Sequence, residues 1–160
     1  MMSFGGAACG RLAEERKSWR KNHPHGFIAR PVSGSDGSLN LFHWQCFIPG
    51  KDGTDWEGGH YPLSIQFSED YPDNSPVCKF AQGFLHPNVY PSGLVCLSII
   101  GEDWKPSITV KQILVGIQDM LDNPNPSSPA NHDINNLYLK DKCEYGRKMQ
   151  LQAQKYPFTI

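Results

Sequence analysis

Apolar residues recur at helical spacing in the part of the chain that follows residue 109. They are Val110, Ile113, Leu114, Ile117 and Leu121, and in a helix they would share one face. Ser107 or Thr109 is placed to cap the start of this helix, and Asn123-Pro124 is placed to end it. The pattern predicts a helix whose apolar face packs on a core.

A second pattern, with a period of two residues, occurs between residues 27 and 80. In residues 61–67, apolar side chains alternate with Pro62, Ser64 and Gln66, which is typical of a half-buried strand. Turns rich in glycine and proline separate it from three other apolar runs. The four predicted strands span residues 27–32, 39–48, 61–67 and 77–80. The short links between them predict an antiparallel meander.

Before the strands, residues 11–21 predict a helix, because Leu12 and Trp19 are seven residues apart and share a face. Residues 1–10 are expected to be a flexible tail.

The remaining segments complete the predicted fold. Residues 81–108 show no clear period and predict a long irregular loop over the sheet. Residues from about 131 to 154 predict one or two helices. No repeat or domain boundary is visible. We therefore predict one α+β domain over residues 1–160.

Composition and charge narrow the classes of partner. With 39% hydrophobic and 19% charged residues the chain is typical of a globular domain. Its net charge of −1 gives no overall attraction to nucleic acid, and we expect neither a nucleic-acid nor a membrane partner. The N-terminal sequence MMSFGGAACG lacks the order of a signal peptide, so we expect a reducing compartment inside the cell.

Charge is nevertheless concentrated on the first predicted helix. Arg16 and Arg20 form one i,i+4 pair, and Lys17 and Lys21 form another, so four cations occupy one side. Such a face is either simply solvated or a docking surface for an acidic partner. We favour docking, because the rest of the chain has no excess of positive charge.

Five cysteines are the next candidates for chemistry: Cys9, Cys46, Cys78, Cys96 and Cys143. Their odd number and long separations indicate neither a metal site nor a disulfide framework. Cys46 and Cys78 lie in apolar strand-like runs and are expected to be buried. Only Cys96 follows an organised turn, in HPNVYPSGLVCLSI, residues 86–99.

A nucleophilic role for Cys96 leaves alternatives open. Neither His86 nor His132 belongs to a recognisable cysteine-protease signature. Exchange of one thioester for another needs no dedicated base, because a thiol is already a fair nucleophile near neutral pH. Asn88 could donate to an oxyanion, or its side chain could brace the HPN turn. The residues alone favour both interpretations equally.

The landmarks together resemble those of the ubiquitin-conjugating enzyme family. They are WEGG at 56–59, DYP at 70–72, HPN at 86–88, Cys96 eight residues after this turn, and the W-x-P of Trp104–Pro106. Within that family the segments RLAEERKSWRKNHPHGF and IPGKDGTDWEGG are most similar to those of SUMO-conjugating members. The resemblance implies the ubiquitin-conjugating fold over almost the whole chain.

The resemblance also implies an activity. Cys96 is expected to accept SUMO as a thioester from the activating enzyme and to pass it to a substrate lysine, forming an isopeptide bond. Asn88 is expected to stabilise the oxyanion or its loop, and Tyr90 to shape the groove for the lysine. No cofactor is expected on this chain, because ATP is used upstream by the activating enzyme.

The same resemblance assigns partners. The cations of the first helix together with His23, hereafter the basic face (Arg16, Lys17, Arg20, Lys21 and His23), are expected to bind SUMO non-covalently and the activating enzyme. SUMO ligases and lysine-bearing proteins are the other expected partners. The chain is expected to be a monomer located in the nucleus and the cytoplasm.

Several residues depart from the pattern of SUMO-conjugating members. Ser128 stands where they often carry an aspartate facing the cysteine, and it is expected to act at the catalytic site without that charge. His132 and Asn135 stand where the substrate motif is read, and Lys79 is the remaining basic group near the end of the sheet. We expect these three to contact substrate. Two alternatives stay open, namely a carrier of ubiquitin or another ubiquitin-like modifier, and a non-catalytic SUMO-binding variant.

Overall fold

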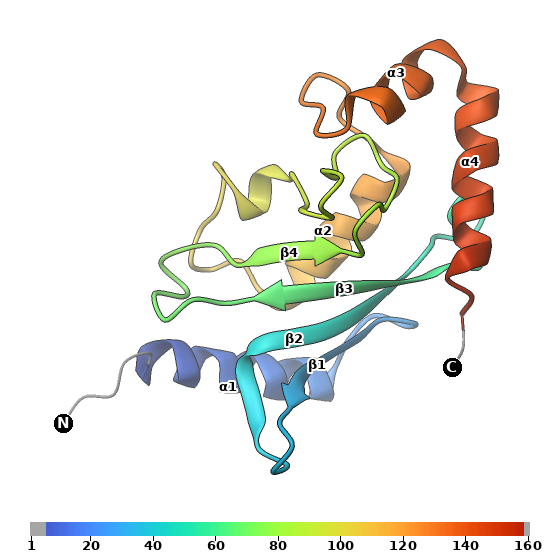
Figure 1. Cartoon of the computed structure of the whole chain (residues 1–160). Helices are drawn as coiled ribbons and strands as arrows, with labels where there is room; N and C mark the ends of the chain where they lie inside the picture. The colour runs from blue at the N-terminus through green and yellow to red at the C-terminus, as the bar shows by residue number, and fades with distance from the viewer. Residues whose placement is uncertain (1–5, 159–160) are drawn as a thin grey trace.

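A computed structural model describes residues 6–158. In chain order its elements are α1 (Gly6–Lys21), β1 (Ile28–Ser33), β2 (Leu39–Pro49), β3 (His60–Gln66), β4 (Val77–Phe80), the short 3-10 helix η1 (Ser98–Ile100), α2 (Val110–Asp122), α3 (His132–Lys140) and α4 (Lys142–Lys155) (Figure 1). The predicted α+β fold and the order of its elements are confirmed.

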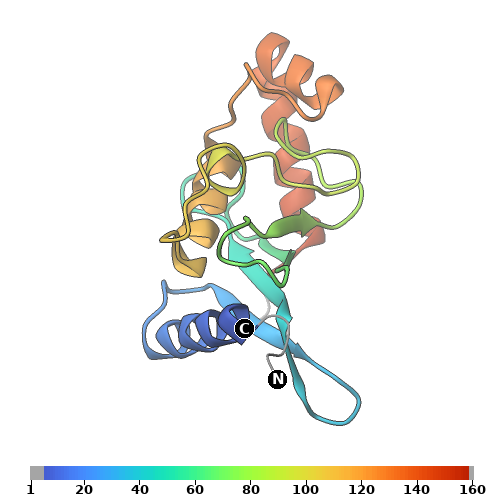
Figure 2. The ribbon, with the colours of Figure 1, turned by 90° about the vertical axis from the view of Figure 1, so that its left-hand side faces the viewer.

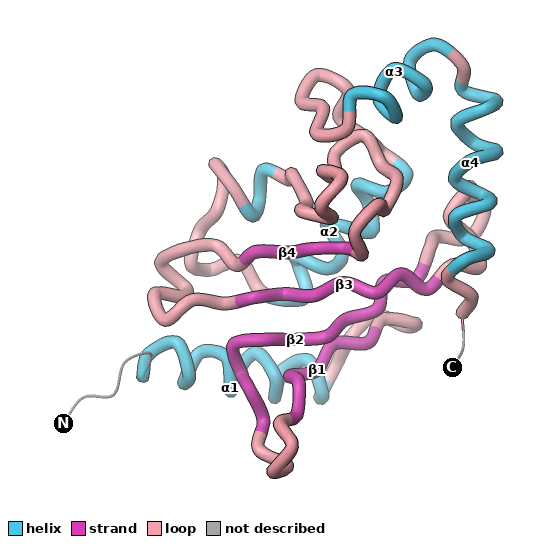
Figure 3. Tube along the Cα trace, viewed as in Figure 1, coloured by secondary structure: helices cyan, strands magenta, loops and turns pink. Residues whose placement is uncertain are grey.

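The four strands form one antiparallel sheet in the order β1-β2-β3-β4, as the meander pattern predicts. Residues of one face are buried in adjacent strands, and the pairing sets Cys46 opposite Leu63 and Ile65 opposite Cys78. After β4 the chain makes a long loop in which only η1 is helical (Figure 3). This is the irregular segment that residues 81–108 predict.

The helices cover the sheet in two groups. Figure 2 shows α1 and α2 on the same side of the sheet, and both contact β2. Helix α4 lies at the end where β3 begins, and α3 contacts α4 at its end away from the sheet (Figure 1). At the start of β3 the amide of His60 donates to the carbonyl oxygen of Tyr156 at 2.7 Å, which ties the end of α4 to the sheet.

Helix α2 forms as its apolar spacing predicts. Its core face is fully buried and comprises Val110, Ile113, Leu114, Ile117 and Leu121. Thr109, rather than Ser107, is the cap. Its hydroxyl accepts from the amide of Gln112, while the Gln112 side chain accepts from the Thr109 amide. This reciprocal capping satisfies two amides that a helix start otherwise leaves unpaired.

Helix α1 is joined to the start of α2 by two side chains. Glu15 accepts a hydrogen bond from the amide of Val110 at 2.7 Å. Arg11 donates to the carbonyl oxygens of Pro106 and Ile108 at 2.7 and 3.0 Å, and pairs with Glu15. These bonds clamp α1 onto the loop that leads into α2.

The expectation of a flexible tail over residues 1–10 is wrong for residues 6–10. They form the first turns of α1, and Ala8 is completely buried there, which supplies the packing energy that a free tail lacks. Residues 1–5 lie outside the described part. The C-terminal region has two helices, with Asp141 capping the second by accepting from the amide of Glu144.

Among residues 6–158, no helix combines the length and the apolar character needed to cross a membrane.

Candidate active site

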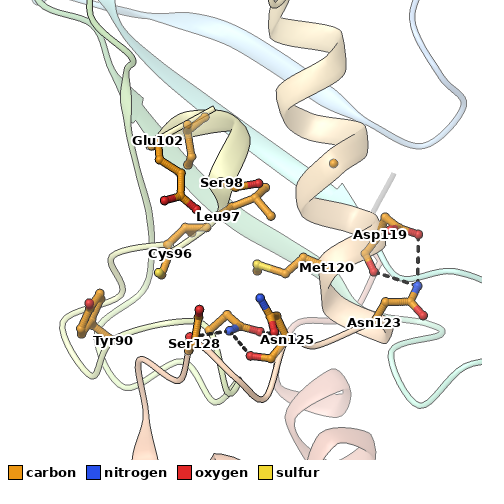
Figure 4. Close-up of a pocket in the computed structure, with 15 residues that line it drawn as sticks. Tyr90, Cys96, Leu97, Ser98, Glu102, Asp119, Met120, Asn123, Asn125 and Ser128 are labelled. Atoms are coloured by element: carbon orange, nitrogen blue, oxygen red, sulfur yellow. Dashed lines mark hydrogen bonds between the residues drawn. The ribbon is translucent and has the colours of Figure 1, made fainter. Parts of the chain in front are cut away.

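Cys96 lies in a cleft of about 530 Å³ that forms where the loop after β4 meets α2 and the segment that follows α2. The cleft brings together Asn88, Tyr90, Cys96 and Ser128, the four residues that the sequence nominates for catalysis (Figure 4). The cleft is not lined by Lys79, His132 or Asn135. It is the surface at which a group bound to Cys96 would meet an acceptor.

The position of Cys96 is set by backbone bonds on both sides of the turn. Its amide donates to the carbonyl oxygen of Asn88 at 2.9 Å, and the amide of Val95 donates to that of Cys78 at 3.0 Å. The turn requires glycine at position 93, because φ is +98° there and a Cβ would collide with the carbonyl oxygen of Phe80. These bonds leave the Cys96 side chain half-buried at the cleft.

His86 is a structural residue rather than a base for Cys96. Its Nε2 lies 2.8 Å from the carbonyl oxygen of Met120 and its Nδ1 accepts from the amide of Asn88 at 2.9 Å. The ring is fully buried, and burial lowers its pKa from 6.5 to about 4. It is therefore neutral near pH 7, and both nitrogens are occupied in joining the HPN turn to the end of α2.

The side chain of Asn88 braces two loops. Its Nδ2 donates to the carbonyl oxygens of Asn125 and Ser128 at 2.8 and 2.9 Å. Its Oδ1 accepts from the amide of Asn125 at 2.8 Å. The residue is 1% exposed. The bracing interpretation is therefore confirmed. Both Nδ2 protons are engaged in these bonds, and the oxyanion role stays a prediction.

The other two nominated residues frame the cleft. Tyr90 is 43% exposed, so its ring is available to an incoming chain. Ser128 is exposed, and it brings no charge to the cleft. Figure 4 shows Cys96 between Ser128 on one side and Glu102 on the other.

Two acidic residues of the cleft were missed by the sequence argument. Glu102 follows η1, and Asp119 lies on the last turns of α2. Neither belongs to a motif, and helical spacing marks Asp119 only as a polar position. The signal for Glu102 was its distance of six residues from the candidate nucleophile.

The three residues predicted to contact substrate differ in their exposure. Asn135 is a correction: it is buried and donates from Nδ2 to the carbonyl oxygen of Pro126 at 3.3 Å, so it supports the loop rather than offering a surface. His132 is exposed at the start of α3. Lys79 is exposed on β4, and its backbone forms a bridge with Leu94, close in sequence to Cys96.

The basic face runs along α1 next to the buried Trp19 and ends at His23, just beyond the helix. Its lysines and Arg20 are exposed and Arg16 is half-buried. No ion pair within residues 6–158 involves any of these cations. His23 stacks on Trp19, with ring centroids 5.0 Å apart, and its Nδ1 lies 2.9 Å from the Trp19 carbonyl oxygen. The positive charge of this face is thus available to a partner.

The remaining cysteines do not line the cleft that holds Cys96. Cys46 and Cys78 are buried, as predicted, and burial raises the pKa of both thiols, that of Cys78 to about 12. Cys9 lies in α1 rather than in a tail, and Cys143 is exposed on α4. Within residues 6–158, no group of histidine, cysteine and acidic residues is arranged to hold a metal ion.

Comparison with known proteins gives one consistent result. Residues 11–153 match the model of the family described as ubiquitin-conjugating enzyme. A protein of Arabidopsis thaliana named SUMO-conjugating enzyme is 65% identical over 97% of this chain and 98% of its own length. Similarly named proteins of Dictyostelium discoideum and Caenorhabditis elegans are 58% and 54% identical, each over 96% of this chain and over 98% and 93% of their own lengths.

Proposed function

Because the chain belongs to the ubiquitin-conjugating enzyme family, we propose that it is a transferase that conjugates SUMO to lysine side chains through a thioester on Cys96. Its similarity to relatives named for SUMO conjugation extends over nearly the whole chain. The observation that carries the chemistry is the single half-buried thiol held by the HPN turn at the cleft.

In the first step the Cys96 sulfur attacks the thioester carbonyl that joins the C-terminal glycine of SUMO to the activating enzyme. A C–S bond forms to Cys96, the earlier C–S bond breaks, and the thiol proton of Cys96 ends on the departing thiol. One thioester replaces another, so the step is nearly thermoneutral and needs no dedicated base. A neutral, fully engaged His86 is compatible with that requirement.

In the second step the neutral amine of a substrate lysine attacks the same carbonyl carbon. A C–N bond forms, the bond to Sγ breaks, and the amine loses a proton as the Cys96 thiol is restored. The oxyanion of the tetrahedral intermediate needs a donor. Asn88 supports this step by fixing the loops of the cleft, and it reaches the oxyanion only if one Nδ2 bond is exchanged.

The proposed partners follow from the two surfaces. SUMO and the activating enzyme dock at the basic face, whose cations suit an acidic partner. Lysine-bearing substrates enter the cleft, Lys79 and His132 are proposed to contact them, and ligases assist the transfer. ATP is consumed by the activating enzyme, so this chemistry needs no cofactor on the chain. The proposed location is the nucleus and the cytoplasm.

A charging assay tests this proposal. The protein is mixed with activating enzyme, ATP and either SUMO or ubiquitin, and the products are separated on a non-reducing gel beside a thiol-treated control. A thiol-sensitive band with SUMO alone supports the proposal. A band with ubiquitin alone keeps Cys96 as the nucleophile and replaces the modifier. No band with either, from folded protein and the cognate activating enzyme, favours a non-catalytic binder.

A further inference from the structure

The Cys96 cleft contains two carboxylates, and only one of them is already engaged. On Asp119, Oδ1 accepts from Nζ of Lys51 and from Nδ2 of Asn123, both at 3.1 Å. Within residues 6–158, no ion pair involves Glu102. Glu102 therefore has the negative charge that remains available in the cleft.

The position of Glu102 suits an entering cation. It follows η1, is exposed, and lines the same cleft as Cys96 and Tyr90. In Figure 4 its carboxylate lies on the opposite side of Cys96 from Ser128. The residues that line the cleft include no lysine, arginine or histidine, so none of the lining side chains repels a positive charge or neutralises Glu102.

An acceptor lysine reaches the cleft as a cation, because its ordinary pKa is about 10.4. A nearby carboxylate attracts the ammonium group but also favours the charged form. It therefore strengthens capture of the lysine and does not itself make the amine nucleophilic. An exposed pair of this kind changes binding only a few-fold.

We propose that Glu102 captures the ammonium group of the acceptor lysine and holds it beside Cys96. This inference rests on the proposed function, because it concerns the second step of that reaction. Ser128 brings no charge to the cleft, and the proposal assigns the negative charge beside Cys96 to Glu102, which follows η1.

The test is a single-turnover discharge. Protein loaded with SUMO on Cys96 is freed of activating enzyme and mixed with increasing concentrations of Nα-acetyl-lysine, which has one amine. Glu102→Gln is expected to raise the half-saturating concentration about three-fold, with the limiting rate unchanged. Glu102→Asp is expected to restore much of the loss. Asp103→Asn, an exposed neighbour that does not line the cleft, is the matched control and is expected to behave as the original protein.

Two further readouts separate capture from a change in loop structure. Hydroxylamine is uncharged at neutral pH, so its discharge rate is expected to be the same with Glu102 or Gln. The difference between the two proteins with Nα-acetyl-lysine is expected to shrink as salt rises, because exposed charges are screened. An unchanged half-saturating concentration overturns the inference, and so does an equal loss with hydroxylamine.

The failure of the inference is distinguishable from that of the proposed function. If only ubiquitin loads Cys96, the modifier is wrong and the same discharge series is run with ubiquitin. If neither modifier loads Cys96, both proposals fall. If SUMO loads normally and Glu102→Gln has no effect on lysine, only the inference is overturned.

Discussion

The Cys96 cleft and the basic face are built in opposite ways. The cleft depends on buried polar groups with defined partners, such as Asn88, which connects the HPN turn to the loop after α2. The four long cations of the basic face form no ion pair within residues 6–158. Activity at the cleft should therefore be lost when a single side chain is replaced. Binding at the basic face should instead vary with the number of its charges.

Replacement of the nucleophile is the strongest way to separate the two regions. Cys96→Ser is expected to abolish transfer to lysine, because an oxyester resists aminolysis far more than a thioester does. The basic face should still dock the activating enzyme, so SUMO is expected to be trapped on the serine as a thiol-resistant ester. A non-reducing gel followed over time measures both. Cys143→Ser, at an exposed cysteine of α4, is the control and should leave charging and transfer unchanged. Normal transfer by the Cys96→Ser variant would refute the assignment.

Removal of the Asn88 brace should have the next largest effect. Asn88→Ala is expected to slow discharge to lysine about 100-fold, since loss of an oxyanion donor costs about 3 kcal/mol and loss of the brace displaces the cleft loops. Thermal melting and single-turnover discharge are measured on the same preparation.

The two measurements distinguish the two roles of Asn88. A lower melting temperature shows that three backbone groups have lost their partner. Slow discharge at an unchanged melting temperature would instead identify an oxyanion donor. An unchanged discharge rate would leave Asn88 with a purely structural role.

The buried His86 makes the cleft side sensitive to acid. In the folded chain burial holds its pKa at about 4, against about 6.5 when unfolded. Between these values the unfolded chain binds a proton that the folded chain does not, so the free energy of unfolding falls as pH drops, by about 3 kcal/mol in total.

Denaturant unfolding between pH 7 and pH 4 measures this loss. His86→Gln is expected to be less stable at pH 7, because it loses the bonds of the ring, and to show a shallower dependence on pH. His132→Gln, at an exposed histidine, is the control and should keep the original slope. An unchanged slope in His86→Gln would assign the acid sensitivity to other groups.

The basic face should show the smallest and most salt-dependent change. Arg16→Glu with Arg20→Glu is expected to weaken loading of SUMO about 10-fold at low salt, and the difference should narrow as salt rises. The initial loading rate at limiting activating enzyme measures it. Lys148→Glu with Lys155→Glu, on exposed residues of α4, changes the net charge equally and should leave loading intact. Equal losses in both variants would mean that only net charge matters.

The fold was largely predictable, because its signals are local. The period of α2 and the alternation of β3 follow directly from which faces are buried, and the predicted strand ends agree with the structure to within one residue. The start of α1 was not predictable, because Gly6 and Gly10 disfavour a helix and only the burial of Ala8 against the core compensates.

The candidate site was predictable only in part. Cys96 and its turn lie within one short segment, so their arrangement has a sequence signature. The brace joins Asn88 to residues 37 and 40 positions later, and no local pattern encodes that distance. The predicted substrate contact of Asn135 was wrong for the same reason, since its position in the sequence gave no indication that Pro126 lies beside it.

Helix α2 also sets the distance between α1, which carries the basic face, and the Cys96 cleft. Its first amide is fastened to Glu15 of α1, and its last turns carry Met120 into the wall of the cleft. The ten residue steps from Val110 to Met120 measure about 15 Å, and each inserted or deleted residue would turn the far end by about 100°. The number of residues in α2 therefore matters separately from their identity. A variant that preserves every side chain of the cleft but lengthens this helix by one residue would still misalign its wall.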